Sequence, residues 1–230
     1  MTGILLVHGA MADGSSWSGV IPHLQAAGHS VLAVQQPLTS IPDDITVVKN
    51  GIKTLMDKSS DPIVVVGHSF GGCVITNAAA GAANIKALVY VQAFAPDEGE
   101  TVVEHSAQFG ELESAQHFVP DASGRISMPQ DMFVKYFAPD MEKQQAQTIA
   151  AAQGPCDADR FGFKSGPPAW KEVKDLYYIV GDKDQIIQPG LQELLAKRMG
   201  AKTTTLAGAS HAGLISQADK VVKVILEAVS

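Results

Sequence analysis

The fold is decided by residues 62–81, PIVVVGHSFGGCVITNAAAG, where a β-branched apolar run meets a glycine-rich turn and then an alanine-rich segment. Such a run is typical of a buried strand, and the alanine-rich segment is typical of a helix. The turn between them has the pattern Gly67-x-Ser69-x-Gly71. A strand, this turn and a helix in that order predict a sharp corner that raises a serine above a parallel sheet.

Ser69 is either a turn residue or a nucleophile, and its glycine neighbours favour the nucleophile. A corner this tight brings backbone segments together, so Cβ atoms at positions 67 and 71 would clash. The corner lifts the hydroxyl of Ser69 above the sheet, and the first turn of the next helix offers free N–H groups to a negatively charged oxygen. We therefore predict that Ser69 attacks a carbonyl carbon.

A serine hydroxyl needs a base, and we predict that His211 is this base. His211 lies in the small-residue loop GASHAGL, after the last predicted strand. In a parallel sheet this loop shares the carboxyl edge with the turn of Ser69. His68 is adjacent to Ser69 and is expected to point elsewhere. The remaining histidines are less suitable as the base. His8, His23 and His29 lie at the end of the first strand or near the first helix, where solvent-facing or capping roles are expected. His105 and His117 fall in an inserted segment, without a nearby acid in a recognisable pattern.

The base needs a carboxylate to orient it, and the stretch YIVGDKDQIIQP offers two. We predict Asp184, which lies three residues after Gly181. On chemistry alone Asp182 is an equal candidate, and either residue could instead cap a turn or a helix.

Two backbone N–H groups are predicted to bind the oxyanion. One belongs to Phe70, directly after the nucleophile, and the other to Ala10, in the loop HGAMADGSSW after the first strand. Gly9 permits close backbone approach in this loop, and His8 is expected to form hydrogen bonds within it.

The chain alternates between short apolar runs and helical segments, which predicts a mostly parallel, twisted α/β sheet with helices on both faces. Strands are expected at residues 4–7, 30–34, 62–67, 87–92, 176–181 and 203–207. Helices are expected at residues 16–27, 45–58, 70–80, 190–199 and 217–229. Residues 96–171 break this rhythm, and we predict that they form a small inserted cap with a hairpin and a helix. Residues 1–95 and 172–230 then form the core of a single domain, 1–230.

Composition excludes several classes of protein. The 230 residues carry 24 acidic side chains against 17 Lys and Arg, a formal net charge of −7 without a basic run, so binding to nucleic acid or to an anionic membrane is not expected. Cys73 and Cys156 belong to no metal-ligand pattern, and no metal is predicted. The first residues lack a signal-peptide pattern, so we expect a cytoplasmic protein.

The motifs LVHGAMADGSSW, VVVGHSFGG, YIVGDKDQIIQP and GASHAGLIS together resemble the α/β-hydrolase superfamily over nearly the whole chain. More narrowly, the chain is similar to the small-cap branch of plant methyl-ester esterases, hydroxynitrile lyases and their bacterial relatives. The resemblance implies eight strands, a cap after the sixth strand, a triad in the order Ser69, Asp184, His211, and no cofactor. The lyases typically carry Thr at position 9 and Lys at position 212, whereas this chain has Gly9 and Ala212, which favours an esterase.

The sequence thus predicts a serine hydrolase that cleaves a small, fairly apolar carboxylic ester. The alternatives are a lyase or a cofactor-free perhydrolase of the same fold, or a ligand receptor that hydrolyses slowly. The expected partner is a small-molecule ester, and the sequence indicates no oligomeric state. Candidate pocket residues are the larger apolar side chains of the loops and the cap: Met11, Trp17, Phe94, Phe133, Tyr136, Trp170 and Leu214.

Overall fold

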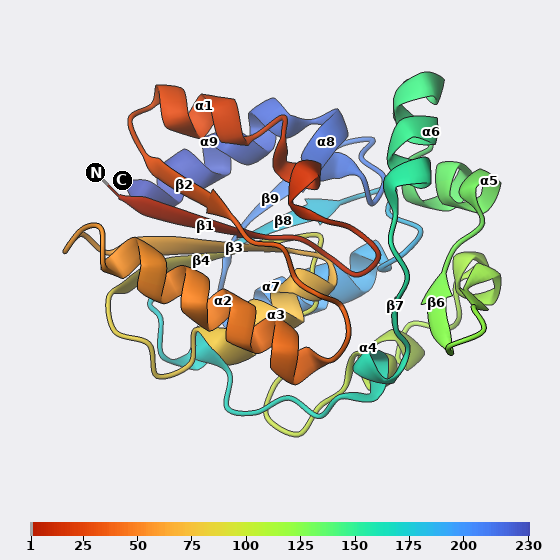
Figure 1. The fold of residues 1–230 in the computed structure, drawn as a ribbon, viewed down its shortest axis with the longest axis horizontal. Helices are drawn as coiled ribbons and strands as arrows, with labels where there is room; N and C mark the ends of the chain where they lie inside the picture. Colours follow the sequence, from red (N-terminus) through yellow and green to blue (C-terminus); the bar gives the residue numbers. More distant parts are fainter. Residues whose placement is uncertain (1) are drawn as a thin grey trace.

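A six-stranded, wholly parallel sheet forms the centre of the computed structural model, which describes residues 2–230 (Figure 1). The strand order is β2-β1-β3-β4-β8-β9. Every strand expected from the sequence is present, with small shifts at the ends. The strands are β1(Gly3–Val7), β2(Ser30–Ala33), β3(Ile63–His68), β4(Ile85–Val91), β8(Asp175–Gly181) and β9(Lys202–Leu206).

Helices cover both faces of the sheet (Figure 1). One face carries α1(Ile21–Ala26), α8(Gly213–Ser216) and α9(Ala218–Val229). The other face carries α2(Ile41–Met56), α3(Phe70–Ala78) and α7(Pro189–Met199). The helix expected at residues 16–27 is instead a 3-10 turn, η1(Gly14–Trp17), followed by the shorter α1.

The central strand β3 explains why both faces need a cover. Its side chains alternate: Ile63 and Val65 pack toward α2 and α3, whereas Val64 and Val66 pack toward α9. All four are buried, which is why the strand is a continuous β-branched run and does not alternate with polar residues. Ser69 follows directly after the last residue of this strand, so the strand determines where the serine lies.

The segment between β4 and β8 forms a small antiparallel sheet and short helices beside the carboxyl edge of the main sheet. The hairpin and the helix expected here are both present, as β5(Val119–Pro120) with β6(Arg125–Ser127) and as α6(Lys143–Ala152). The other elements are α4(Val102–Ala107), η2(Glu113–His117), α5(Gln130–Met132), the π-helical turn η3(Phe133–Phe137), β7(Cys156–Asp157), η4(Asp159–Gly162) and η5(Ala169–Lys171).

The eight strands implied by the resemblance are not found: within residues 2–230 the main sheet has six. The reason lies at its edges, because β2 and β9 each pair on one side only, and no described strand extends the sheet beyond them. The insert therefore follows the fourth strand along this chain. No helix in the described range is long and apolar enough to cross a membrane.

Candidate active site

Ser69 lies at the corner between β3 and α3, in a strained backbone conformation with φ 54° and ψ −125°. A residue with a side chain adopts a positive φ only where its surroundings impose it. The surroundings are very close here: a Cβ on Gly67 would lie 2.7 Å from the carbonyl oxygen of Gly71. A Cβ on Gly71 would lie 2.5 Å from the carbonyl oxygen of His8. The two glycines of the motif are therefore required by packing.

Ser69, His211 and Asp184 form one chain of hydrogen bonds. The hydroxyl of Ser69 lies 2.8 Å from Nε2 of His211, and Nδ1 of His211 lies 2.8 Å from Oδ2 of Asp184. With Nδ1 protonated, the imidazole donates to the carboxylate and accepts the hydroxyl proton of the serine. All three side chains are buried. This geometry can transfer a proton from the hydroxyl to the imidazole.

The carboxylate of Asp184 is held by several donors besides His211. Its Oδ1 accepts hydrogen bonds from the backbone N–H groups of Ile186 and Ile187, at 2.8 and 2.9 Å. Its Oδ2 accepts from Nε2 of Gln192 at 2.8 Å and from Nε2 of Gln92 at 3.2 Å. With His211, five donors surround the two oxygens, which act as acceptors throughout. The side chain is thus fixed in one orientation.

Asp182, the alternative acid, lies in a different place. Its Oδ1 accepts a hydrogen bond from the backbone N–H of Gly208 at 2.7 Å, across the loop that follows β9. This contact ties two loops together and leaves the side chain half-buried. The structure brings Asp184, and not Asp182, to the imidazole of His211.

His8 and His68 are buried beside the site and are both held by hydrogen bonds. Nδ1 of His8 donates to the carbonyl of Gly9 at 2.9 Å, and its Nε2 accepts from the N–H of Gln36 at 2.9 Å. Nε2 of His68 donates to the carbonyl of His211 at 3.0 Å. Burial lowers the pKa of both imidazoles, so they stay neutral at pH 7. His8 thus bonds within its loop as expected, and His68 supports the backbone of His211.

Two residues with free backbone amides border the same cavity as Ser69. Ala10 and Phe70 line the cavity that contains Ser69, and Phe70 is the first residue of α3. Neither N–H donates to an acceptor within residues 2–230. Free amides in this position are the donors that a tetrahedral oxyanion needs.

The cavity over Ser69 has a volume of about 360 Å³ and a mostly apolar lining. Of the candidate pocket residues, Met11 and Phe94 line it. Phe133 and Leu214 instead line a smaller neighbouring cavity of about 90 Å³, which Met11 also borders. The others lie elsewhere: Trp17 and Trp170 in the cores on the two faces of the sheet, and Tyr136 stacked on His117.

Comparisons with known proteins identify the family and the fold of the chain. Residues 4–224 match the model of the alpha/beta hydrolase family. The chain belongs to this family. A carbendazim hydrolyzing esterase of Nocardioides sp. (strain SG-4G) is 32% identical over 127 residues, which cover 47% of this chain and 52% of that protein. An alpha-hydroxynitrile lyase of Arabidopsis thaliana is 38% identical over 103 residues, which cover 40% of each chain.

The matched part of this chain thus spans about half the length of the carbendazim hydrolyzing esterase and less of the hydroxynitrile lyase. The crystal structure of polyneuridine aldehyde esterase has the same fold over the full length of both chains, with a TM-score of 0.86 and 18% sequence identity. Similarity at this level concerns the fold alone. The family follows from the match over residues 4–224, and esterases are among the relatives of this chain.

Sequence reasoning missed most of the residues that line the cavity of this hydrolase. The ring of Phe137 lies edge-on to the imidazole of His211, with centroids 4.7 Å apart. Phe137 is the last residue of an aromatic turn in the insert, and only that clustering of aromatic residues could have indicated it. The other large apolar residues of the lining lie on four separate segments: Val102, Val103, Leu112, Phe118, Phe161 and Ile186.

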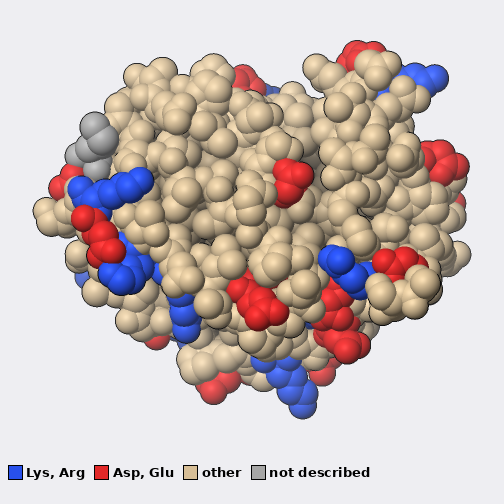
Figure 2. All heavy atoms as spheres, viewed as in Figure 1, with Lys and Arg blue, Asp and Glu red and all other residues tan. Residues whose placement is uncertain are grey.

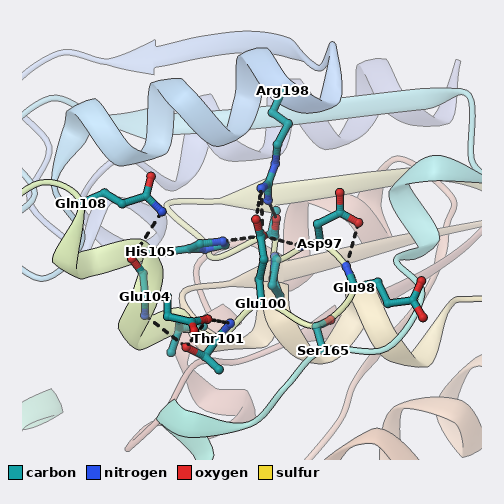
Figure 3. A network of polar contacts seen from close by, with 12 residues as sticks. Asp97, Glu98, Glu100, Thr101, Glu104, His105, Gln108, Ser165 and Arg198 are labelled. Carbon is teal, nitrogen blue, oxygen red and sulfur yellow. Dashed lines mark hydrogen bonds and ion pairs between the residues drawn. The ribbon is translucent and has the colours of Figure 1, made fainter.

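A polar network holds one wall of the cavity in place (Figure 3). Nε2 of His105, on α4, lies 2.6 Å from Glu100, and Arg198 of α7 contacts both carboxylate oxygens of Glu100 at 2.8 Å. Burial raises the pKa of Glu100, but hydrogen bonds from the Asp97 N–H, His105 and Arg198 outweigh it and lower the pKa to about 2. The sequence showed no acid in a recognisable pattern near His105, and the structure pairs it with Glu100, which lies five residues earlier and outside α4.

Charged groups do not gather into a patch of one sign on the face of the protein in Figure 2. On the face shown in Figure 2, acidic and basic side chains are interspersed over a largely uncharged surface. In the described part of the chain, no group of three or more His, Cys, Asp or Glu side chains is arranged to hold a metal ion.

Proposed function

We propose that the protein is a serine hydrolase that cleaves a small, fairly apolar carboxylic ester through an acyl-enzyme on Ser69. The observation that carries this proposal is the hydrogen-bonded chain Ser69–His211–Asp184, with its two distances of 2.8 Å, at the floor of an apolar cavity. A hydrogen bond from the serine hydroxyl to an imidazole activates the hydroxyl as a nucleophile. In a cavity of this size it can attack a bound carbonyl.

In the first half of the reaction, Oγ of Ser69 bonds to the carbonyl carbon while Nε2 of His211 takes the hydroxyl proton. The carboxylate of Asp184 stabilises the imidazolium that forms. The N–H groups of Ala10 and Phe70 bind the oxyanion. When the C–O bond to the leaving group breaks, Nε2 gives its proton to the departing alkoxide, and an alcohol leaves.

In the second half, a water molecule replaces the alcohol. His211 takes a proton from water as its oxygen bonds to the acyl carbon, and the second tetrahedral intermediate collapses. The acid is released and the hydroxyl of Ser69 is restored with its proton. Protons and electrons balance within the protein, the ester and water, so this mechanism requires no cofactor.

The cavity lining supports a neutral, apolar substrate. Among residues 2–230, the titratable side chains that line it are His211 and Glu111, and no Lys or Arg of this range lines it to pair with a carboxylate or phosphate. Aromatic and aliphatic side chains make up most of the remainder. We therefore propose small-molecule esters without an anionic group, covered by residues 96–171 as a cap.

A lyase of the same fold has less support. A Cβ on Gly9 would lie 2.7 Å from Cβ of Ser69, so this backbone leaves no room for the Thr that is typical of the lyases. Ala212 is fully buried and packs against the insert, where the Lys typical of lyases would not fit without rearrangement. Both positions favour ester hydrolysis.

We also propose that the protein works in the cytoplasm. Cys73 and Cys156 are buried free thiols, which suit a reducing compartment. Fractionation of cells that express the protein would test this, and recovery in the secreted fraction would contradict it.

The test is to treat the purified protein with a fluorophosphonate probe and with short-chain aryl esters, beside Ser69→Ala. We expect labelling and turnover in the wild type, and neither in the variant. Ser60→Ala, at an exposed serine after α2, is the matched control and should behave as the wild type. A wild type that neither labels nor turns over any ester would contradict the proposal, as would a Ser69→Ala variant that matches it. Slow turnover with tight retention of the acid would favour a receptor.

A further inference from the structure

The two candidate oxyanion donors lie on separate segments, so something must fix one against the other. Ala10 follows β1, and Phe70 begins α3. The residue after Ala10, Met11, has a positive φ of 59°. A side-chain-bearing residue keeps such a conformation only where neighbouring structure imposes it. The packing around Met11 therefore decides where the amide of Ala10 points.

Residues 154–157 of the insert hold the loop of Met11. The N–H of Gly154 donates to the carbonyl of Met11 at 3.2 Å. The N–H of Asp157 donates to the carbonyl of Leu38 at 2.9 Å, and Leu38 also has a positive φ, 57°. One apolar cluster joins these segments: Met11, Leu38 and Cys156, with Ala10 at its edge. The insert thus pairs with both strained loops at once.

Arg160 is the side chain on which these contacts converge. Its Nε donates to the carbonyl of Asp157 at 3.0 Å, and its Nη2 lies 3.1 Å from Oδ2 of Asp44 on α2. Both charged side chains are fully buried. Oδ1 of Asp44 accepts from the N–H of Leu38 at 2.9 Å, and the guanidinium carbon lies 5.2 Å from the ring centroid of Phe70. Arg160 therefore contacts the insert, the core helix α2 and the residue with the second oxyanion donor.

We propose that Arg160 is a positioning residue. It holds the loop of Ala10 and Met11 at a fixed position relative to Phe70, so that the backbone amides of Ala10 and Phe70 both face the oxyanion. Arg160 does not line the cavity, and it acts through residues 154–157, Asp44 and the ring of Phe70. The inference rests on the proposed serine hydrolase function. It assigns the insert a part in oxyanion binding, in addition to covering the substrate.

Stability alone gives little reason to bury this ion pair. Two charges removed from water lose their hydration, and replacement of a buried pair by uncharged side chains is often neutral or stabilising. A double variant, Arg160→Met with Asp44→Asn, removes both charges together. The Asn oxygen can still accept from the N–H of Leu38, and Met fills much of the volume of the arginine stem. This variant should fold, yet it lacks the hydrogen bond from Arg160 to the carbonyl of Asp157 and the ion pair that ties this segment to α2.

The experiment compares this double variant with the wild type, with Arg160→Lys and with Val221→Ala. Val221 is a fully buried residue of α9, on the opposite face of the sheet, and its truncation destabilises the fold at a distance from the site. Three quantities are measured below the melting temperatures of all variants: kcat and KM for p-nitrophenyl butyrate, the inhibition constant of phenylboronic acid, and hydrogen exchange of residues 8–14. Phenylboronic acid forms a tetrahedral adduct with the serine and so reports on oxyanion binding.

In the double variant we expect kcat to fall about tenfold, because misplacing one reacting group by a fraction of an ångström weakens transition-state binding. KM should stay within about twofold, boronate affinity should fall by about the same factor as kcat, and residues 8–14 should exchange faster. Arg160→Lys, which keeps the charge, should show a smaller loss. Val221→Ala should melt earlier, with kcat and exchange at residues 8–14 unchanged.

Wild-type kcat, boronate affinity and exchange in the double variant would overturn the inference. Equal losses in Val221→Ala would also overturn it, since general destabilisation would then explain them. If the wild type shows neither ester turnover nor fluorophosphonate labelling, the proposed function fails, and this is a separate result. The exchange measurement still decides in that case whether Arg160 holds residues 8–14.

Discussion

Gln192 and Asp184 share a hydrogen bond of 2.8 Å, in which Nε2 of Gln192 donates to Oδ2 of the carboxylate. The same oxygen accepts from Nδ1 of His211. Gln192 is fully buried on α7, and its Oε1 accepts from the N–H of Gly181 at the end of β8. One amide side chain thus ties the acid to the strand and helix that flank it, and the acid can meet the imidazole in one orientation only.

Asp184→Asn should therefore abolish most of the ester turnover, whereas Asp182→Asn should leave most of it. The Asn amide can donate to Nδ1, which places the imidazole proton on Nε2, where it cannot accept from Ser69. A loss of about 10⁴-fold in kcat follows from the wrong tautomer. Asp182→Asn keeps an oxygen that can accept from Gly208 and should retain kcat within about twofold. The reverse ranking of the two variants would make Asp182 the acid.

Five of the six strands could be predicted because each is a short apolar run bounded by turn residues; β9 is instead a run of β-branched threonines, which also favour a strand. The juxtaposition of Ser69, Asp184 and His211 could be predicted as well, since loops after parallel strands meet at one edge of the sheet. The structure places the three side chains within hydrogen-bonding distance, and their catalytic roles remain predictions. The same reasoning predicted that the backbone N–H groups of Ala10 and Phe70 lie near Ser69.

The cavity lining and the buried ion pair could not be predicted, because they depend on contacts between residues far apart in sequence. Phe118, Phe137 and Phe161 line the cavity because the insert folds over it, and its short elements have no hydrophobic period that would orient them. The buried pair of Asp44 and Arg160 joins α2 to the insert, and no local pattern marks either residue. The strand number taken from the resemblance was wrong, since the main sheet has six strands within residues 2–230.

Gly9→Thr should remove esterase activity without producing a lyase. Its Cβ would lie 2.7 Å from Cβ of Ser69 and 3.3 Å from the carbonyl oxygen of His68, so the corner must shift. We expect kcat for aryl esters to fall at least about 100-fold, because the nucleophile moves relative to its base. Gly162→Thr, at an exposed glycine with open space around its Cβ position, is the control and should retain activity. Rapid cyanide release from mandelonitrile, by the wild type or by Gly9→Thr, would instead support the lyase alternative.

Glu100 should stabilise the fold above about pH 4.5 and lose this effect in acid. Its pKa in the folded state is about 2, against 4.5 for the free side chain, so the unfolded chain binds the proton first as the pH falls. The stabilisation is therefore fully present above pH 4.5 and is lost between pH 4.5 and 2. The side chain is about one-third exposed, and solvent screening reduces the effect to about 1–2 kcal/mol.

Urea unfolding at pH 7, 5 and 3 would measure this contribution. Glu100→Gln should lower the free energy of unfolding at pH 7 and should make it less dependent on pH below 4.5 than in the wild type. Glu98→Gln, at an exposed neighbour in the same segment, is the control and should follow the wild-type curve. Parallel curves for the wild type and Glu100→Gln would show that the network in Figure 3 does not hold this carboxylate ionised.

Val103→Asp should weaken binding of apolar esters and leave the chemical steps intact. Val103 lines the cavity, yet its side chain is 55% exposed, so a carboxylate there stays hydrated and the fold tolerates it. A charged group in place of an apolar contact costs about 1 kcal/mol of substrate affinity, which is roughly a fivefold rise in KM at unchanged kcat. The matched control is Val119→Asp, since Val119 is 43% exposed and lies outside the lining. An unchanged KM for p-nitrophenyl butyrate in Val103→Asp, or an equal rise in Val119→Asp, would show that the substrate does not occupy this end of the cavity.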